Sequence, residues 1–220
     1  MYLPTLFQEA RVPVLHALIR RHGLAVLVTM GPDGLTADHI PMELDPEPPP
    51  LGTLRGHVAR ANPVWRTASR DVEALAIFQG PDHYVSPAWY PTKRETGKVV
   101  PTWNYAVVHA HGPLRIVEEA AWLRRLVEQL TNRFEAGRAQ PWHVTDAPED
   151  FVATQLKAIV GIELPLTRLR GKWKVSQNRM AADRSGVVEG LRALDNPGSR
   201  VVADLVAEAD PERRSPASEA

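Results

Sequence analysis

The chain has 220 residues, of which 44% are hydrophobic and 24% are charged, and its 26 basic and 26 acidic residues leave no formal net charge at pH 7. This balance argues against a nucleic-acid backbone as the main partner, because binding to phosphates depends on clustered cationic charge. The lack of cysteine excludes disulfides, thiol catalysis, iron–sulfur ligation and zinc fingers.

The opening residues, MYLPTLFQEARVP, have neither the basic start nor the apolar run of a signal peptide. The chain also has no stretch near the roughly 20 apolar residues that a membrane-spanning helix requires. We therefore expect a soluble cytoplasmic protein without a membrane partner.

The first quarter of the chain is predicted to hold one helix and two strands. Apolar spacing predicts a helix over 5–22 that begins or breaks near Pro13. LAVLVTM, 24–30, is typical of a buried strand, and the GPDG that follows supplies hairpin-turn residues. The returning strand, 35–44, contains Pro41, which favours an edge or a bulge over a central position.

The next segments alternate between loops and short elements. DPEPPP predicts an exposed loop, LGTLRGHV a strand, and Asn62 followed by Pro63 the start of a short helix. EALAIFQG predicts another apolar strand. HYVSPAWYPTKRETGK, 83–98, is interpreted as a long loop, and long loops inside compact domains are usually functional.

The second half is predicted to add strands and most of the helices. VPTWNYAVVHAHGPLRIV predicts two strands separated by a Gly-Pro break, and AIVGIELPLTRLRGKWKV predicts one long strand. Helices are expected at 118–136, 148–156, 183–194 and 197–206, and a disordered tail at 207–220. Since regular crossover helices are missing, we expect one α+β domain over 1–206, mainly β with peripheral helices, built as a closed or split antiparallel barrel.

The strand VPTWNYAVVHAHG has two different faces, because side chains alternate along a strand. Ala106, Val108 and Ala110 share the face of Asn104, and these small apolar residues suit a packed interior. Trp103, Tyr105, His109 and His111 lie on the other face, which suits a ligand, a subunit interface or a covering helix. Spacing alone favours an interface or core over a site.

The chain lacks the common sequence motifs of metal sites, nucleophilic serines and nucleotide-binding loops. His109 and His111 have no third ligand at a characteristic spacing, so we expect no metal site. The sequence also contains no G-x-S-x-G elbow, no G-x-G-x-x-G and no Walker loop. No residue stands out as a dedicated acid or base, so the catalytic residues stay unknown.

Cationic residues near turns are better candidates for binding. Arg60 follows a strand and precedes a helix, where backbone N–H groups and a guanidinium together hold a phosphate. Lys93 lies in an aromatic loop with Trp89 and Tyr90. GKWKVSQNR, 171–179, is basic and aromatic, and suits nucleic acid, a phosphorylated small ligand or a partner subunit.

Six stretches, in order, together resemble one family, the PaiB-type FMN-binding proteins that are often labelled negative transcriptional regulators. They are MYLPTLF, ADHIPMEL, GHVARANPVW, YVSPAWYPTK, VPTWNYAVVHAHG and GKWKVSQNR. The resemblance extends over about four fifths of the chain. It implies an FMN-binding split barrel related to pyridoxamine 5′-phosphate oxidase, usually a homodimer with flavin at the subunit interface.

The resemblance also implies where the flavin binds. It assigns the FMN phosphate to Arg60, with His57 and Asn62 beside it. The isoalloxazine ring is expected against Asp38, His39, Ile40 and Pro41 and against the loop with Ser86, Trp89 and Lys93. Thr102, Trp103 and Asn104 are expected from the partner or the neighbouring strand, and Lys172, Gln177 and Arg179 are expected to close the site.

The family resemblance leaves the function open between three alternatives. The first is a transcriptional regulator or redox sensor that uses the bound flavin. The second is an FMN-dependent oxidoreductase, either a flavin reductase or an enzyme like pyridoxamine-phosphate oxidase. The third is a haem-binding relative with His109 or His39 as axial ligand. We do not expect direct DNA binding, because no helix-turn-helix is apparent and the last two helices are short and acidic.

Overall fold

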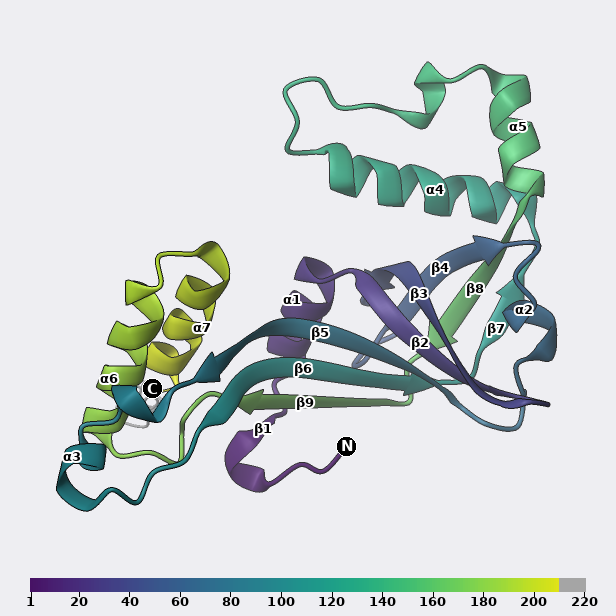
Figure 1. Cartoon of the computed structure of the whole chain (residues 1–220). Helices are drawn as coiled ribbons and strands as arrows, with labels where there is room; N and C mark the ends of the chain where they lie inside the picture. The colour runs from purple at the N-terminus through teal and green to yellow at the C-terminus, as the bar shows by residue number, and fades with distance from the viewer. Residues whose placement is uncertain (210–220) are drawn as a thin grey trace, which may run out of the picture. The chain divides into compact units, whose positions relative to one another are not determined.

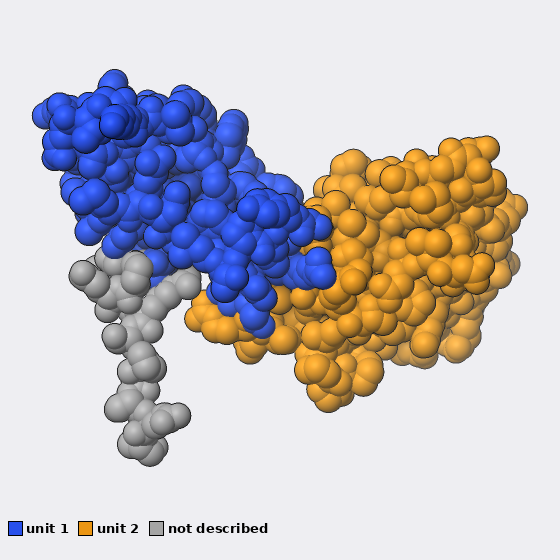
Figure 2. Space-filling view, turned by 90° about the horizontal axis from the view of Figure 1, so that it is seen from below, with its two compact units in different colours: residues 1–10, 79–108, 170–220 blue, residues 11–78, 109–169 orange. Residues whose placement is uncertain are grey.

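The structure, a computed structural model, describes residues 1–209. Within them the chain forms two compact units, which Figure 2 shows in different colours. The first unit consists of residues 1–10, 79–108 and 170 onward, and the second consists of residues 11–78 and 109–169. Both units contain parts of the strands β5 (Ala74–Val85), β6 (Thr102–Gly112) and β9 (Arg168–Lys174). The single domain expected over 1–206 therefore stays a prediction.

The second unit is an antiparallel sheet with helices beside it. Its strand order is β5-β2-β3-β4-β8-β7, and neighbours pair antiparallel. Leu27, Met42, Leu54 and Ile162 are fully buried in its core. Its elements are α1 (Val12–Arg21), β2 (Leu24–Gly31), β3 (Gly34–Asp45), β4 (Thr53–Ala59), α2 (Val64–Thr67), β7 (Arg115–Val117), α4 (Ala120–Glu135), the 3-10 turn η3 (Val144–Asp146), α5 (Glu149–Lys157) and β8 (Ile159–Pro165).

The GPDG sequence forms the predicted hairpin. Gly31 pairs with Gly34, so that the two residues between them make the turn that connects β2 and β3. Gly34 has φ +102°, a conformation that a residue with a Cβ rarely adopts. The turn fixes the register of both strands, and Ile40 of β3 enters the core opposite Ala25.

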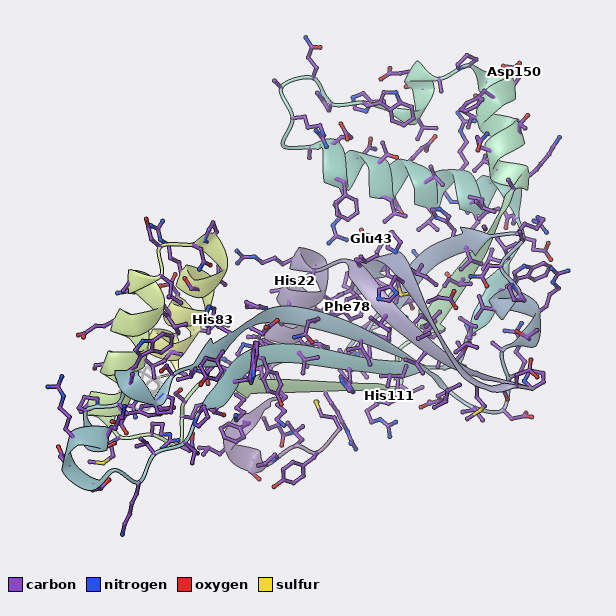
Figure 3. All side chains as sticks on the ribbon, in the orientation of Figure 1. His22, Glu43, Phe78, His83, His111 and Asp150 are labelled. Carbon is purple, nitrogen blue, oxygen red and sulfur yellow. The ribbon has the colours of Figure 1, made fainter. Side chains whose placement is uncertain are left out.

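Helix α4 packs against strands of the second unit, as Figure 1 shows. Leu123, Leu126 and Leu130 are buried along one side of the helix, as the apolar stripe predicts. Glu43 of β3, labelled below α4 in Figure 3, forms an ion pair of 2.5 Å with Arg133. The leucines and this ion pair attach the helix to the sheet.

The first unit combines the outer parts of the shared strands with a helical hairpin. Its other elements are the 3-10 turns η1 (Thr5–Phe7) and η2 (Pro87–Trp89), β1 (Gln8–Glu9), α3 (Thr92–Thr96), α6 (Ala181–Ala193) and α7 (Pro197–Glu208). Strand β1 pairs antiparallel with β9. Helices α6 and α7 lie side by side (Figure 1), with Val187, Leu191, Val202 and Val206 buried.

The two faces of β6 agree with the predicted alternation. Asn104, Ala106, Val108 and Ala110 are at most 1% exposed, which is the packed face. On the other face, Trp103 is 53% exposed at the start of the strand. The period of two therefore predicted the faces of this strand correctly.

The structure agrees with two predictions made at prolines and differs from the prediction for one loop. The first helix begins at Val12, beside Pro13, which is one of the two predicted alternatives, because Pro13 occupies the second helical position and Arg11 is extended. The loop predicted at 83–98 is largely structured, since β5 continues to Val85 and η2 and α3 follow. Pro41 pairs with Leu24 of β2, and the pairing of β3 with β4 begins at Met42, so Pro41 lies in the edge part of β3, as predicted.

The single long strand predicted near the end of the sheet is also wrong. It is two strands, β8 and β9, which are separated after Pro165. The amide of Leu166 donates to Gly52 O, and the amide of Thr167 donates to His111 O. These bonds hold the segment that separates the two strands.

The end of the described chain is helical past the predicted boundary. Helix α7 extends to Glu208, two residues beyond the predicted end of the helix at residue 206. The rest of that predicted tail, from residue 210, lies outside the described residues. Between residues 1 and 209, none of the helices has the length and apolar character that a bilayer-spanning segment requires.

Candidate functional site

Asp38 and Asn62, two of the predicted flavin residues, contact each other in the second unit. The Asn62 Nδ2 donates to Asp38 Oδ1 at 2.7 Å, and Asn62 Oδ1 accepts from the Val64 amide at 2.9 Å. Asn62 thus caps the short helix α2 and attaches it to β3. His39 and Pro41 are exposed on the same strand, whereas Ile40 is 3% exposed and belongs to the core.

Arg60, the predicted phosphate ligand, has partners at all three guanidinium nitrogens. Its Nη1 forms an ion pair of 2.6 Å with Glu118, its Nε donates to Lys157 O at 2.9 Å, and its Nη2 donates to Ile159 O at 3.2 Å. Lys157 is the last residue of α5, where helix carbonyls lack internal partners, and Ile159 is the first residue of β8. Arg60 therefore joins the end of β4 to α5, and its contact with a phosphate stays a prediction.

His57 lies on the side of β4 that faces α4. It pairs with Gly161, and a Cβ at Gly161 would come within 2.3 Å of the Trp122 ring. Cross-strand partners share a face of the sheet, so His57 is on the face that α4 covers. Its Nδ1 is buried without a hydrogen-bond partner, and burial lowers the pKa of His57. Its contact with flavin likewise stays a prediction.

The aromatic segment after β5 is fixed by its own contacts in the first unit. Ser86 caps η2 by accepting a hydrogen bond from the Ala88 amide. The Trp89 ring lies against Gly190, where an added Cβ would come within 2.4 Å of the ring. Lys93 is exposed. Trp89 therefore packs against α6, while Lys93 is accessible to solvent.

Three cations gather at the ends of β6 and β9 in the first unit, and we call Lys172, Lys174 and Arg179 the basic cluster. Lys174 donates to the Thr102 hydroxyl and to Trp103 O, the latter at 2.9 Å. Lys172 donates to Tyr2 O at 3.1 Å, and its Nζ lies 5.4 Å from the centroid of the Tyr105 ring. The two strands thus bring together residues about 70 positions apart in the sequence.

The basic cluster carries positive charge that no acid neutralises. Within residues 1–209, none of its three members forms an ion pair with a carboxylate. Burial lowers the pKa of Lys174, and the charges of Lys172 and Arg179 lower it further. An anion beside Lys174 would relieve both the repulsion and part of the cost of burial.

An exposed aromatic side chain adjoins this charge. Trp103, whose carbonyl accepts from Lys174, is 53% exposed, and its ring meets Tyr84 edge to face with centroids 6.2 Å apart. A planar aromatic ligand can stack on such a side chain. The basic cluster and Trp103 together therefore suit a flat ligand that carries negative charge.

The side chains of Asn104 and Gln177, which are near the basic cluster, already form hydrogen bonds within the protein. The Asn104 amide and the Ser176 hydroxyl are hydrogen-bonded at 2.9 Å, and both residues are buried. Gln177 accepts from the Val175 amide and donates to Trp173 O. These bonds fix the turn after β9, where Ser176 has φ +64°.

Tyr90 and Asp183 form a further cluster that sequence reasoning did not assign. Tyr90 is 2% exposed, and the Arg179 guanidinium lies 4.5 Å from the centroid of its ring. The buried Asp183 carboxylate accepts from the hydroxyl and the amide of Thr92. Burial raises the pKa of Tyr90. No spacing in the sequence connects these residues, because α3, β9 and α6 meet only in the fold.

Comparison with known proteins adds a family and a fold. A family model described as "Putative FMN-binding domain" matches residues 1–168. An uncharacterised protein of Emericella nidulans is 37% identical over 94% of this chain and 97% of its own length. The Bacillus subtilis "Protease synthase and sporulation protein PAI 2" is 30% identical over 94% of this chain and 96% of its own.

A solved structure shares the fold at low sequence identity. The FAD and heme binding protein from Mycobacterium smegmatis superposes with a TM-score of 0.56, is 16% identical, and covers 76% of this chain and 73% of its own. The predicted fold class, mainly antiparallel β with peripheral helices, is confirmed.

Proposed function

Because this chain belongs to the PaiB-type family of FMN-binding proteins, we propose that its basic cluster and Trp103 bind the ring of FMN and that the bound flavin serves as a redox sensor. FMN is the cofactor that the family match supports. The observation that carries the proposal is three cations without an acid partner next to an exposed tryptophan.

The residues of this cluster suit the chemistry of a flavin. FMN, when bound, supplies reversible electron transfer, and the protein tunes it through the charge placed near the ring. Lys174 offers that charge, held in position by Thr102 and the Trp103 carbonyl. Trp103 offers an aromatic surface for stacking. The negative charge that reduced FMN carries would be stabilised here more than the neutral oxidised ring.

The proposal is tested by titrating the protein with FMN and with riboflavin, following flavin fluorescence. Lys174→Met is expected to weaken both ligands by about tenfold or more, since a charge-assisted contact contributes about 1.5–3 kcal/mol. Lys98→Met, which alters an exposed lysine of the same unit, is the matched control. Equal affinities of the Lys174→Met variant and the unmodified chain would refute this site.

The same titration locates the phosphate. FMN and riboflavin differ only by the phosphate, so a residue that binds it changes their ratio. Loss of FMN affinity in Arg60→Ala, with riboflavin unchanged, would support the sequence-based assignment of the phosphate to Arg60. If Lys174→Met instead weakens FMN much more than riboflavin, the phosphate would be assigned to the basic cluster.

We further propose that the protein is a homodimer with the flavin near the subunit interface. Several large apolar residues of the first unit are more than 40% exposed, which is costly in an isolated chain. They are Tyr2, Leu6, Tyr84, Val100 and Trp103. A second copy that covers them would also exclude water from the basic cluster and thereby strengthen its electrostatic effect.

Solution mass tests this assembly. Light scattering is expected to give twice the chain mass, and Trp103→Asp is expected to shift the distribution toward monomer by burying a charge in the interface. Trp142→Asp, at an equally large and 47% exposed residue of the second unit, is the control. A monomeric unmodified protein would contradict the proposal.

Regulation through direct contact with a DNA groove is not part of the proposal. In the α6–α7 hairpin, Arg192 pairs with Asp204 at 3.1 Å and Arg200 pairs with Asp195. Arginines that are already neutralised release few counterions from DNA. A gel-shift titration that showed steeply salt-dependent binding would reverse this view and support a DNA-binding repressor.

A further inference from the structure

A cavity lies in the second unit, between α4 and α5, and neither Trp103 nor a residue of the basic cluster lines it. Its volume is about 360 Å³, within the range of small-molecule sites. Figure 1 shows α4 and α5 beside the end of β4. Arg60, which follows β4, is one of the residues that line the cavity. Its size therefore allows a small organic ligand and excludes a dinucleotide.

The wall of this cavity is apolar and made of small side chains. Three alanines and two leucines line it, and alanines at a helix–helix contact leave open the space that larger residues fill. Arg124 connects the two helices beside the cavity. It forms an ion pair with Glu128 of α4 at 3.0 Å and another with Glu149 of α5 at 2.5 Å. The lining residues are Ala120, Ala121, Leu123, Ala153 and Leu156.

The rim of the cavity is charged and has one uncompensated cation. Arg60 pairs with Glu118, and Arg124 pairs with Glu149. Lys157, which also lines the cavity, forms no ion pair within residues 1–209. Arg124 pairs with Glu128 as well as with Glu149, so the positive charge that a ligand can pair with at this opening is that of Lys157.

We propose that this cavity is a binding site for a small amphipathic monocarboxylate, whose apolar body lies against the alanines and leucines and whose carboxylate pairs with Lys157. An apolar wall favours a hydrocarbon chain over a polar metabolite. Lys157 is the lining cation without an ion pair, and it lies beside the Arg60–Glu118 and Arg124–Glu149 pairs. This arrangement favours a ligand with a single negative charge over a phosphate dianion or an amine. The bound ligand would connect α4 to α5 and stabilise the helical pair.

Isothermal titration calorimetry with octanoate, octanamide and octylamine tests both parts of the proposal. The three probes share one chain length and differ in head-group charge. Octanoate is expected to bind more tightly than octanamide, and octylamine is expected not to bind. Equal binding of octylamine and octanoate would overturn the charge argument, and no binding of octanoate would overturn the site.

Two variants locate the binding. Lys157→Gln is expected to weaken octanoate by about tenfold and to leave octanamide unchanged, with Lys98→Gln as the surface control. Ala153→Phe is expected to abolish the binding of both, because it fills the cavity from an exposed position that tolerates a larger side chain. Unchanged octanoate binding in both variants would refute the location. FMN affinity is expected to be the same in both variants, so failure of this proposal is distinguishable from failure of the flavin site.

Discussion

The charged residues of this chain differ in whether an acid neutralises them, and that difference separates structural from binding candidates. Arg60 is paired with Glu118 and with the carbonyls of Lys157 in α5 and Ile159 in β8, so its position in the sequence suggested a ligand but its contacts attach α5. The partners of the Lys174 ammonium group within residues 1–209 are a hydroxyl and a carbonyl. Sequence spacing could not make this distinction, because Glu118 is 58 residues from Arg60.

His57 gives the protein a predictable sensitivity to acid. Burial lowers the pKa of His57 below its ordinary value of 6.5, so between these two pKa values the unfolded chain binds more protons than the folded protein. Stability therefore falls as the pH drops from above 6.5 through the folded-state pKa. Urea denaturation between pH 7.5 and about 5 is expected to show this loss, with a smaller slope in His57→Gln.

The control for this experiment is His39→Gln, which alters an exposed histidine on the neighbouring strand. It is expected to keep the slope of the unmodified protein. His22, whose pKa is also lowered by burial, leaves a residual slope in every variant. Identical slopes for His57→Gln and His39→Gln would contradict the role of His57.

The secondary-structure features that could be predicted are those that depend on residues close together in the sequence. GPDG fixes the β2–β3 hairpin, and the period of two fixes the faces of β6. The division of the last strand into β8 and β9 was not predictable, because the break after Pro165 depends on hydrogen bonds to Gly52 and His111, which are distant in the sequence. Lys172 and Arg179 of the basic cluster were predicted as residues of one site. Lys174 was not among the predicted flavin residues, because its contacts with Thr102 and Trp103 exist only in the fold.

The packing of α4 on the sheet depends on the absence of a side chain at Gly161. A Cβ there would come within 2.3 Å of the Trp122 ring, so either the ring or the helix must shift. Gly161→Ala is expected to lower the free energy of unfolding by about 1–3 kcal/mol, the usual cost of overpacking. Gly137→Ala is the matched control, since a Cβ at Gly137 meets nothing within 4 Å. Equal stability of the two variants in urea would show that α4 does not press on this strand.

Over the whole molecule, the separate sites belong to different parts of the chain. The second unit holds the α4–α5 cavity and the Asp38–Asn62 contact, and the first unit holds the basic cluster and most of the exposed aromatic residues near it. The family match starts at residue 1 and ends at residue 168, before the basic cluster begins. The cluster therefore has to be established by its own chemistry and not by the match.

The midpoint potential of the bound flavin tests the central claim most directly. Lys174→Met removes the charge that is proposed to favour reduced FMN, so the potential is expected to become more negative by about 30 mV or more, which corresponds to a tenfold change for two electrons. Lys98→Met is expected to leave the potential unchanged. A potential in Lys174→Met equal to that of the unmodified protein, or more positive, would contradict the assignment of the flavin ring to the basic cluster.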